Sequence, residues 1–553
     1  MKKYILIILI LFITTTVFAN PKTVVPGVTL ERFSEYNGDR QVINVARIDL
    51  SRSDIHLEVG LGDNNKTYNG KPFGKESVSQ IVEKSGALLG VNADFFIMEA
   101  FRDNLNFSLV KGEIISEPQY NRSVMFIGRD NHIFFDVPKL EMTAFMSDGT
   151  SFKITGINRN RNAGDIILYT DKFAPSTLNK YKAFDVVLNP VFGQRITPNS
   201  QITYQVEKLL PNSINNPIEP GKVLLSSSLS TCPILEYLQI GDIITLDVRM
   251  TTKEPFENIV FATGGGPMLV QNGSVNITSK AENFKADIAV GKAPRTAVGL
   301  SENGKELILV TVDGRTKEST GMTLETLAKF MQNMGAYNAM NLDGGGSTTM
   351  SVLGLVMNYP SGIVERNVAN ALLCFSDYKG NGIIPEKNYE GLTVRGNSAY
   401  WLREKDPNAI FGTRGGVGFV DSENVLWTTG QERVGKIGLV VDGIKYEYDM
   451  EISNAPLSDV IVEASQSETE ENVWNVKATL LDKNKNPMAL TSIFIYAMNG
   501  ALDDVRFVSD EKGEIFFNVL FYPPEQTEGE ESLSEPVRSL RFVFGKFSKT
   551  ITF

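Results

Sequence analysis

The chain has 553 residues, and at about 150 residues per domain this length predicts between three and four domains. Hydrophobic residues make up 42% and charged residues 22%, which is ordinary globular usage and excludes a disordered, collagenous or multi-span membrane chain. The net charge of −11 argues against a nucleic-acid partner, and the supply of two His and two Cys excludes most zinc and iron–sulfur chemistry.

The first residues predict export. Lys2 and Lys3 precede an apolar run from Tyr4 to Ile13, which is shorter than the ~20 residues needed to cross a bilayer. Val17-Phe18-Ala19 then suits signal peptidase. We therefore expect cleavage near Ala19 and a secreted, periplasmic or cell-envelope protein.

The next elements alternate in type. Residues 24–57 alternate apolar and polar positions, which is typical of strands. A helix is expected after Ser77 and ends at Gly86, and a buried strand follows it. A second helix is expected to start at the N-cap Thr323 and to stop at Gly335, again before a strand.

The two helix-to-strand units match in register. Residues 86–94 and 335–343 share Gly, Ala, Asn and Asp at equivalent positions, and each unit ends in Asn-x-Asp. We interpret this as a pseudo-repeat whose two strand ends present Asn92 and Asp94, and Asn341 and Asp343, into one central pocket; coincidence among small, common residues is the alternative.

The composition changes after Phe375. Residues 376–390 are polar and contain Gly and Pro, which indicates a boundary, and all three Trp lie beyond it in short β-rich runs. We expect the Trp side chains in cores, with sugar stacking as the alternative. The predicted fold class is α+β: a mixed, β-rich catalytic module with few helices, followed by two small all-β immunoglobulin-like sandwiches. The expected organisation is a signal peptide at 1–19, the N-terminal β-rich part of the module at 20–84, its main part at 85–376, a linker at 377–390, and sandwiches at 391–455 and 456–553.

Several short motifs carry functional groups. The most specific is Asn341 to Thr349, in which a strand ending in Asp343 opens onto three glycines and three hydroxyl residues. Such a loop can form a concavity of backbone amides that suits an anion. The other clusters are residues 90–96, Gly264-Gly265-Gly266-Pro267, residues 294–299, residues 312–315 and residues 365–370.

In this order, the motifs resemble the phosphodiester glycosidase family, which includes the lysosomal uncovering enzyme and many secreted bacterial proteins. The resemblance covers about residues 85–376. It implies hydrolysis of a sugar-1-phosphodiester at the anomeric carbon, in a glycan or cell-surface polysaccharide. One departure is Ala93-Asp94, where relatives often carry glycines before the paired aromatic residues.

Chemistry suggests roles for the motif residues. Glycoside hydrolysis normally uses two carboxyl groups, and a phosphate leaving group adds a demand for positive charge. Asp343 is the expected nucleophile or base, Asp94 or Asp313 its partner, and Glu365 a reserve acid. Arginine pairs bidentately with phosphate, so the expected phosphate and substrate ligands are Arg295 first, then Arg315 and Arg366, with Asn92, Asn341, Gly265, Gly344, Gly345, Gly346, Ser347 and Thr348.

Two other function classes stay open. The module could bind envelope glycans without catalysis, or it could break the P–O bond as a phosphodiesterase. No cofactor is expected to be required, and a Ca²⁺ or Mg²⁺ ion is left open, since clustered carboxylates can bind either. The expected partner is a phosphate-bearing glycan or sugar phosphate, with association to the cell envelope through the C-terminal domains left open.

Overall fold

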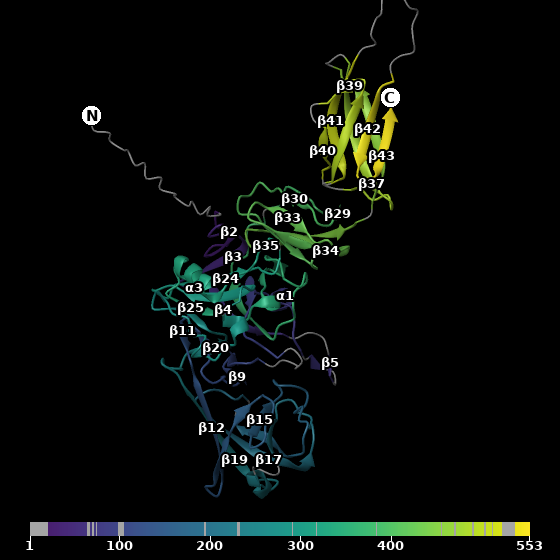
Figure 1. Ribbon diagram of the computed structural model, residues 1–553. Coiled ribbons are helices and arrows are strands. Elements are labelled where there is room, and N and C mark those ends of the chain that lie inside the picture. The colour runs from purple at the N-terminus through teal and green to yellow at the C-terminus, as the bar shows by residue number, and fades with distance from the viewer. Residues whose placement is uncertain are drawn as a thin grey trace, which may run out of the picture.

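The protein, described from a computed structural model, is rich in strands and has few helices (Figure 1). The structure describes residues 20–62, 67–68, 71–72, 74–97, 104–192, 195–228, 233–289, 291–316, 318–382, 384–454, 456–468, 472–488, 491–502, 505–510, 512–522 and 537–553. The predicted signal peptide at 1–19 lies outside them. Within the described residues, no helix is long and apolar enough to cross a membrane. The predicted β-rich fold class is confirmed.

Two large sheets form the central module, and they share one hydrophobic core that includes Val91 and Met340. The first has eight strands in the order β1 (Lys22–Val25), β2 (Val28–Tyr36), β3 (Asp39–Asp49), β24 (Glu306–Val312), β23 (Arg295–Leu300), β25 (Asn338–Asn341), β21 (Met268–Gln271) and β22 (Ser274–Val275). The second has nine strands in the order β29 (Leu392–Val394), β35 (Ile444–Ile452), β34 (Arg433–Val441), β31 (Ile410–Arg414), β27 (Leu355–Val356), β26 (Met350–Val352), β7 (Leu89–Asn92), β28 (Asn370–Ser376) and β4 (Ile55–Leu61).

The helices confirm the predicted start and stop signals. Helix α1 (Val78–Ser85) begins after Ser77, whose side chain accepts a hydrogen bond from the Gln80 amide, and ends at Gly86 with φ +75°. Helix α3 (Leu324–Asn333) begins after Thr323, which accepts from the Thr326 amide at 3.1 Å. Each helix feeds the strand that carries an Asn-x-Asp ending, α1 into β7 and α3 into β25. A short helix, α2 (Ala286–Ala289), precedes β23.

A third part of the structure is inserted between the two halves of the module. A five-stranded sheet contains β11 (Ile133–Asp136), β10 (Val124–Gly128), β20 (Ile259–Gly264), β8 (Ser108–Val110) and β9 (Glu113–Ser116). An eight-stranded sheet follows, with β13 (Ser151–Ile154), β12 (Lys139–Met146), β19 (Ile243–Thr251), β17 (Ser200–Ser213), β16 (Ala183–Phe192), β18 (Val223–Ser228), β15 (Ile166–Thr170) and β14 (Gly156–Ile157). The eight-stranded sheet lies at one end of the molecule (Figure 1). Separately, β5 (Thr67–Tyr68) and β6 (Lys71–Pro72) pair as two antiparallel strands.

The C-terminal regions differ in how they join the module. Strands β29, β31, β34 and β35 of the predicted 391–455 unit extend the nine-stranded sheet, because β31 pairs with β27. The unit adds a small sheet of β30 (Ala399–Trp401), β33 (Val425–Thr428) and β32 (Gly418–Val420). The last region forms a sandwich at the other end of the molecule (Figure 1) from β36 (Leu457–Gln466), β37 (Val473–Asp482), β41 (Glu514–Phe521) and β39 (Gly500–Ala501) against β40 (Arg506–Val508), β38 (Ser492–Met498), β42 (Ser539–Phe544) and β43 (Phe547–Thr552).

The tryptophans follow the expectation only in part. Trp474 packs against the core of the C-terminal sandwich. Trp401 is 64% exposed, so the prediction of core packing is wrong for this residue, which lies on a short strand of the small three-stranded sheet.

Candidate functional site

The ends of β7 and β25 meet, as the pseudo-repeat predicts. Asn92 donates from Nδ2 to the Asp343 carbonyl oxygen at 2.6 Å, and the Asp343 amide donates to the Ala93 carbonyl at 2.8 Å. The Asn92 Oδ1 accepts from the Thr296 hydroxyl at 2.7 Å and from the Thr349 amide at 3.1 Å. The Asn92 side chain is fully buried, so its visible role is to join the two sheets and to fix Asp343.

Asp94 follows β7 and is almost completely buried. Its Oδ2 accepts from the Asn106 amide at 2.9 Å, and its Oδ1 has no partner among the described residues. Burial raises the pKa of Asp94 to about 8; amide donors oppose this rise, and the nearby charge of Asp343 adds to it. A Cβ on Gly264 would lie 2.8 Å from both carboxyl oxygens, so this glycine makes the space that Asp94 occupies.

Asp343 follows β25 and keeps part of its surface open. Its Oδ1 accepts from the Gly344 amide at 2.9 Å. Burial raises the pKa of Asp343 to about 6, while the Ser347 hydroxyl, the Arg366 charge and the Gly344 amide lower it. At neutral pH Asp94 is therefore mainly protonated and Asp343 mainly ionised. Pairs of carboxyl groups with separated pKa values are typical of acid and base partners.

The glycines after Asp343 let two arginines approach the loop. A Cβ on Gly345 would lie 3.4 Å from Arg315 Nη2, and one on Gly346 would lie 2.3 Å from Arg366 Nη2. Arg315 itself has φ +64°, in the left-handed region, and its side chain is exposed. Both guanidinium groups thus lie against the loop that starts at Asp343.

Most amides of this loop bind within the protein. The amide of Gly345 donates to the Pro294 carbonyl, that of Ser347 to Gly344, and that of Thr348 to Gly345. Ser347 and Thr348 are buried, and Ser347 Oγ lies 3.4 Å from Arg366 Nη1. The two arginines, more than the predicted concavity of amides, therefore offer positive charge to an anion.

Two further predicted ligands lie in the packed framework behind the loop. Asn341 donates from Nδ2 to the carbonyls of Gly266 and Leu342 at 2.9 and 2.7 Å. Its Oδ1 accepts no hydrogen bond from the part of the chain that the structure describes. A Cβ on Gly265 would lie 2.9 Å from the Asn341 carbonyl oxygen, so Gly265 permits close contact with β25.

Arg295, the first choice for a phosphate ligand, is 3% exposed at the start of β23. Its Nε donates to the Met322 carbonyl at 2.9 Å, and its Nη2 donates to the Ile288 and Gly291 carbonyls at 3.0 and 2.6 Å. Burial lowers its pKa to about 10, and the charge of Arg315 adds to this. These hydrogen bonds anchor the segment around α2 and occupy the Arg295 guanidinium. Arg295 is therefore less available to a bound ligand than Arg315 and Arg366 are.

Asp313 lies behind the glycine loop. Its carboxylate accepts from Asn358 Nδ2 at 2.8 Å and from the Tyr359 amide at 2.7 Å. Asn358 also donates to the Thr348 carbonyl at 3.1 Å, which ties Asp313 to the loop from behind. Burial raises the pKa of Asp313 to about 7. Nothing in these contacts brings its carboxyl group to Asp343.

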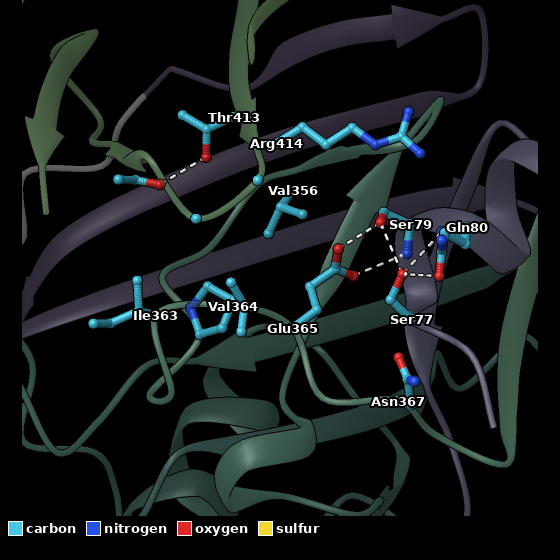
Figure 2. Close-up of a pocket in the computed structure, with 14 residues that line it drawn as sticks. Ser77, Ser79, Gln80, Val356, Ile363, Val364, Glu365, Asn367, Thr413 and Arg414 are labelled. Atoms are coloured by element: carbon cyan, nitrogen blue, oxygen red, sulfur yellow. Dashed lines mark hydrogen bonds between the residues drawn. The ribbon is translucent and has the colours of Figure 1, made fainter. Parts of the chain in front are cut away.

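Glu365 is bound at the start of α1. Its carboxylate accepts from the Ser79 amide at 2.9 Å and from the Ser79 hydroxyl, at the first turn of α1. It lines a cavity of about 300 Å³ between α1 and the turn after β31, which Figure 2 shows. Burial raises the pKa of Glu365, and the bonds from Ser79 oppose the rise.

Sequence reasoning missed Arg122. Its guanidinium lies 3.6 Å from the ring centroid of Phe284, and its charge lowers the pKa of Asp94. Burial in turn lowers the pKa of Arg122. Arg122 lies before β10 in the folded chain, outside every motif, and the pairing of β10 with β20 helps to place it near Asp94.

The described residues contain no group of three or more His, Cys, Asp or Glu side chains placed to hold a metal ion. The prediction of a Ca²⁺ or Mg²⁺ ion stays open. Cys374 is a free, buried thiol, and burial raises its pKa to about 12. Cys232 lies outside the described residues.

The fold and the site define a two-sheet, β-rich module with a carboxyl pair of separated pKa values and two arginines beside it. Residues 218–375 match the family model described as phosphodiester glycosidase, which confirms the predicted resemblance over this segment. N-acetylglucosamine-1-phosphodiester alpha-N-acetylglucosaminidase of Bos taurus is 35% identical over 129 residues, 22% of this chain and 23% of the relative. The chain thus spans about a quarter of the length of the curated relatives it matches.

Two solved structures share the fold. A protein from Synechocystis superposes with a TM-score of 0.53 at 23% identity, over 64% of this chain and 62% of that chain. A Burkholderia pseudomallei protein described as exported gives a TM-score of 0.50 at 20% identity, over 61% of this chain and 74% of that chain.

Proposed function

We propose that the protein hydrolyses a sugar-1-phosphodiester at the glycosidic C–O bond. One observation carries the proposal: hydrogen bonds join the ends of β7 and β25, so that Asp94 and Asp343 follow two adjacent strand ends, with Arg315 and Arg366 against the loop after Asp343. The raised pKa values of the two carboxyl groups agree with this arrangement. The match of residues 218–375 to the phosphodiester glycosidases supports the same reaction class.

Asp343 is the group that acts at the anomeric carbon, as nucleophile or as the base that takes a proton from water. It is ionised near neutral pH and is only partly covered. Hydrolysis adds water across the C1–O bond: the sugar gains a hydroxyl at C1, and the phosphate monoester leaves with the electron pair of the broken bond.

The leaving group is an anion, so charge matters more than proton transfer at this step. Arg315 and Arg366 flank the glycine loop and can stabilise the phosphate as it departs. Asp94 is mainly neutral at neutral pH, and it can donate a hydrogen bond to the departing oxygen without repelling it.

The site of action is proposed to be outside the cytoplasm, in the periplasm, at the cell envelope or in the medium. The predicted signal peptide supports this, as does the fold neighbour described as exported. The substrate proposed is a phosphate-bearing glycan, and the C-terminal sandwich is proposed to hold the enzyme near the envelope.

Hydrolysis in ¹⁸O-labelled water tests the reaction directly. The purified protein is incubated with a panel of α-linked sugar-1-phosphodiesters, beginning with N-acetylglucosamine 1-(methyl phosphate), and the products are analysed by mass spectrometry. Label in the C1 hydroxyl of the sugar is the expected result. Label in the phosphate would show P–O cleavage, and a lack of turnover across the panel with retained glycan binding would favour a binding protein.

A further inference from the structure

The segment 360–367 carries two charged side chains at neighbouring positions that reach opposite sides. Arg366 lies against Gly346 and Ser347, in the loop that follows Asp343. Glu365 turns toward α1, where Figure 2 shows its carboxylate directed at Ser79. Neighbouring residues of an extended segment commonly point to opposite sides. A shift of the backbone at residues 365–366 would therefore move both side chains.

The contact between Glu365 and α1 uses both carboxyl oxygens. The first amides of a helix have no partner inside the helix, and the partial positive charge there favours a carboxylate. Glu365 accepts from the Ser79 amide at 2.9 Å and from the Ser79 hydroxyl, and Ser79 is 2% exposed. Both oxygens of Glu365 are therefore bound by Ser79.

Hydrogen bonds from backbone amides hold the ends of the segment, and within it the Ile363 amide donates to the Pro360 carbonyl at 2.9 Å. The Tyr359 amide donates to Asp313 at 2.7 Å, and Val368 and Glu76 exchange backbone hydrogen bonds of 2.8 and 3.0 Å. Between these ends, Ile363 has φ +72°, which is unfavourable for a β-branched residue. A strained turn of this kind needs support from its surroundings, and Glu365 supplies a side-chain tie close to Arg366.

The hydrogen bond by which Arg366 itself binds the glycine loop is weak. Its hydrogen bond from Nη1 to Ser347 Oγ is long at 3.4 Å. The guanidinium fits because Gly346 has no side chain: a Cβ there would lie 2.3 Å from Nη2. The position of the Arg366 guanidinium therefore depends on the position of the backbone at residue 366.

We propose that Glu365 is a positioning residue: its bonds to Ser79 at the start of α1 hold the 360–367 segment so that Arg366 faces the phosphate of the substrate. This inference rests on the proposed function in assigning phosphate to Arg366. It replaces proton donation by Glu365 with a mechanical role, in which the shape and acceptor atoms of the side chain matter and its acidity does not.

Three substitutions separate the roles. Glu365→Gln keeps an oxygen for the Ser79 amide and an NH₂ for the Ser79 hydroxyl, whereas Glu365→Ala removes both contacts. Glu83→Ala is the matched control, because Glu83 also lies on α1 but binds Arg414 at 2.9 and 2.6 Å and Lys445 at 3.1 Å. Ser79→Ala removes only the hydroxyl and serves if Glu365→Ala does not fold.

The full-length protein is titrated with inorganic phosphate by calorimetry, and kcat/KM is measured on the sugar-1-phosphodiester that it hydrolyses. Misplacement of a positioned group by about 1 Å can cost about 100-fold, so Glu365→Ala should lower kcat/KM by roughly 10- to 100-fold and weaken phosphate binding about 10-fold. Glu365→Gln and Glu83→Ala should stay within about 3-fold of the parent, and Ser79→Ala should fall between.

The decisive comparison is made in an Arg366→Ala background. There, adding Glu365→Ala should change phosphate binding and kcat/KM by less than about 2-fold, since the residue acts through Arg366. Additive losses would overturn the proposal, and so would a Glu365→Gln variant as impaired as Glu365→Ala, which would show that the acidity of Glu365 is required. If no sugar-1-phosphodiester is turned over, the proposed function fails, and the phosphate titrations still decide the role of Glu365.

Discussion

Replacing Asp94 by Asn should change the shape of the pH–rate profile more than the rate at neutral pH. In the parent, the base Asp343 has a pKa of about 6 and Asp94 a pKa of about 8. We therefore expect kcat/KM to rise as Asp343 ionises, to peak near pH ~7, and to fall as Asp94 loses its proton. The variant keeps the acid limb and loses the alkaline one.

The magnitudes follow from the site. The amide side chain that Asp94→Asn introduces can still accept from the Asn106 amide, and its NH₂ takes the place of Asp94 Oδ1, which has no partner among the described residues. A positioned general acid contributes about 10²- to 10⁴-fold, but a phosphate departs as a stable anion, so the loss near pH ~7 should be only about 10-fold. Above pH ~8 the parent loses about 10-fold per pH unit as the protonated fraction falls, so the two profiles should meet about one unit higher.

The assay is kcat/KM for a sugar-1-phosphodiester at low substrate concentration, in buffers of constant ionic strength across the two limbs. Asp343→Asn serves as the comparison, and circular dichroism checks that each variant is folded. An alkaline limb that persists unchanged in the Asp94→Asn variant would refute the assignment of the upper pKa to Asp94.

The remaining predictions concern the same groups. Asp343→Asn should reduce kcat by at least about 10³-fold with the fold retained, as measured by turnover and thermal unfolding, because a nucleophile or base is lost. Gly346→Ala should cut kcat/KM by about 100-fold, because its Cβ would lie 2.3 Å from Arg366 Nη2 and the guanidinium must move; unaltered kinetics would count against Arg366. Asp94→Asn should also stabilise the protein at alkaline pH. Because the pKa is raised, the native state between pH ~4 and ~8 still holds a proton that the unfolded state has already lost, so the parent loses stability as pH rises there, by up to about 6 kcal/mol. Urea unfolding of the parent and of the Asp94→Asn variant at pH ~4 and pH ~8 measures this change. A difference in unfolding free energy between the two proteins that is the same at both pH values would contradict the prediction.

Local signals predicted the elements that carry the site. Ser77 and Gly86 bound α1, and Thr323 begins α3, because capping depends on a few neighbouring residues. The shared Asn-x-Asp endings predicted that β7 and β25 would meet, and the bond from Asn92 to the Asp343 carbonyl confirms it. A repeat within one chain carries information about packing that a lone motif does not.

Pairing between strands that are distant in the sequence determines the rest of the fold and of the site, and the sequence did not predict this pairing. The strands between Ser108 and Gly264 divide into a five-stranded and an eight-stranded sheet, and no local pattern in the sequence determines which strands pair. Arg295 has the residue type of a phosphate ligand, yet its partners come from 288, 291 and 322, and only the fold brings those carbonyls to it. The pairing of β10 with β20 helps to place Arg122, which precedes β10, where its charge lowers the pKa of Asp94.

The acidic balance of the chain explains why Asp94 should be neutral. A protein of net charge −11 gains no help from its overall field in capturing an anionic diester, so attraction must be local. Arg315 and Arg366 lie against the glycine loop, and the charge of Arg122 acts on Asp94, so the positive charge is concentrated at the carboxyl pair. Ionisation of Asp94 would offset part of this positive charge. Burial beside Gly264, which raises the pKa of Asp94, therefore serves capture of the substrate as much as proton donation.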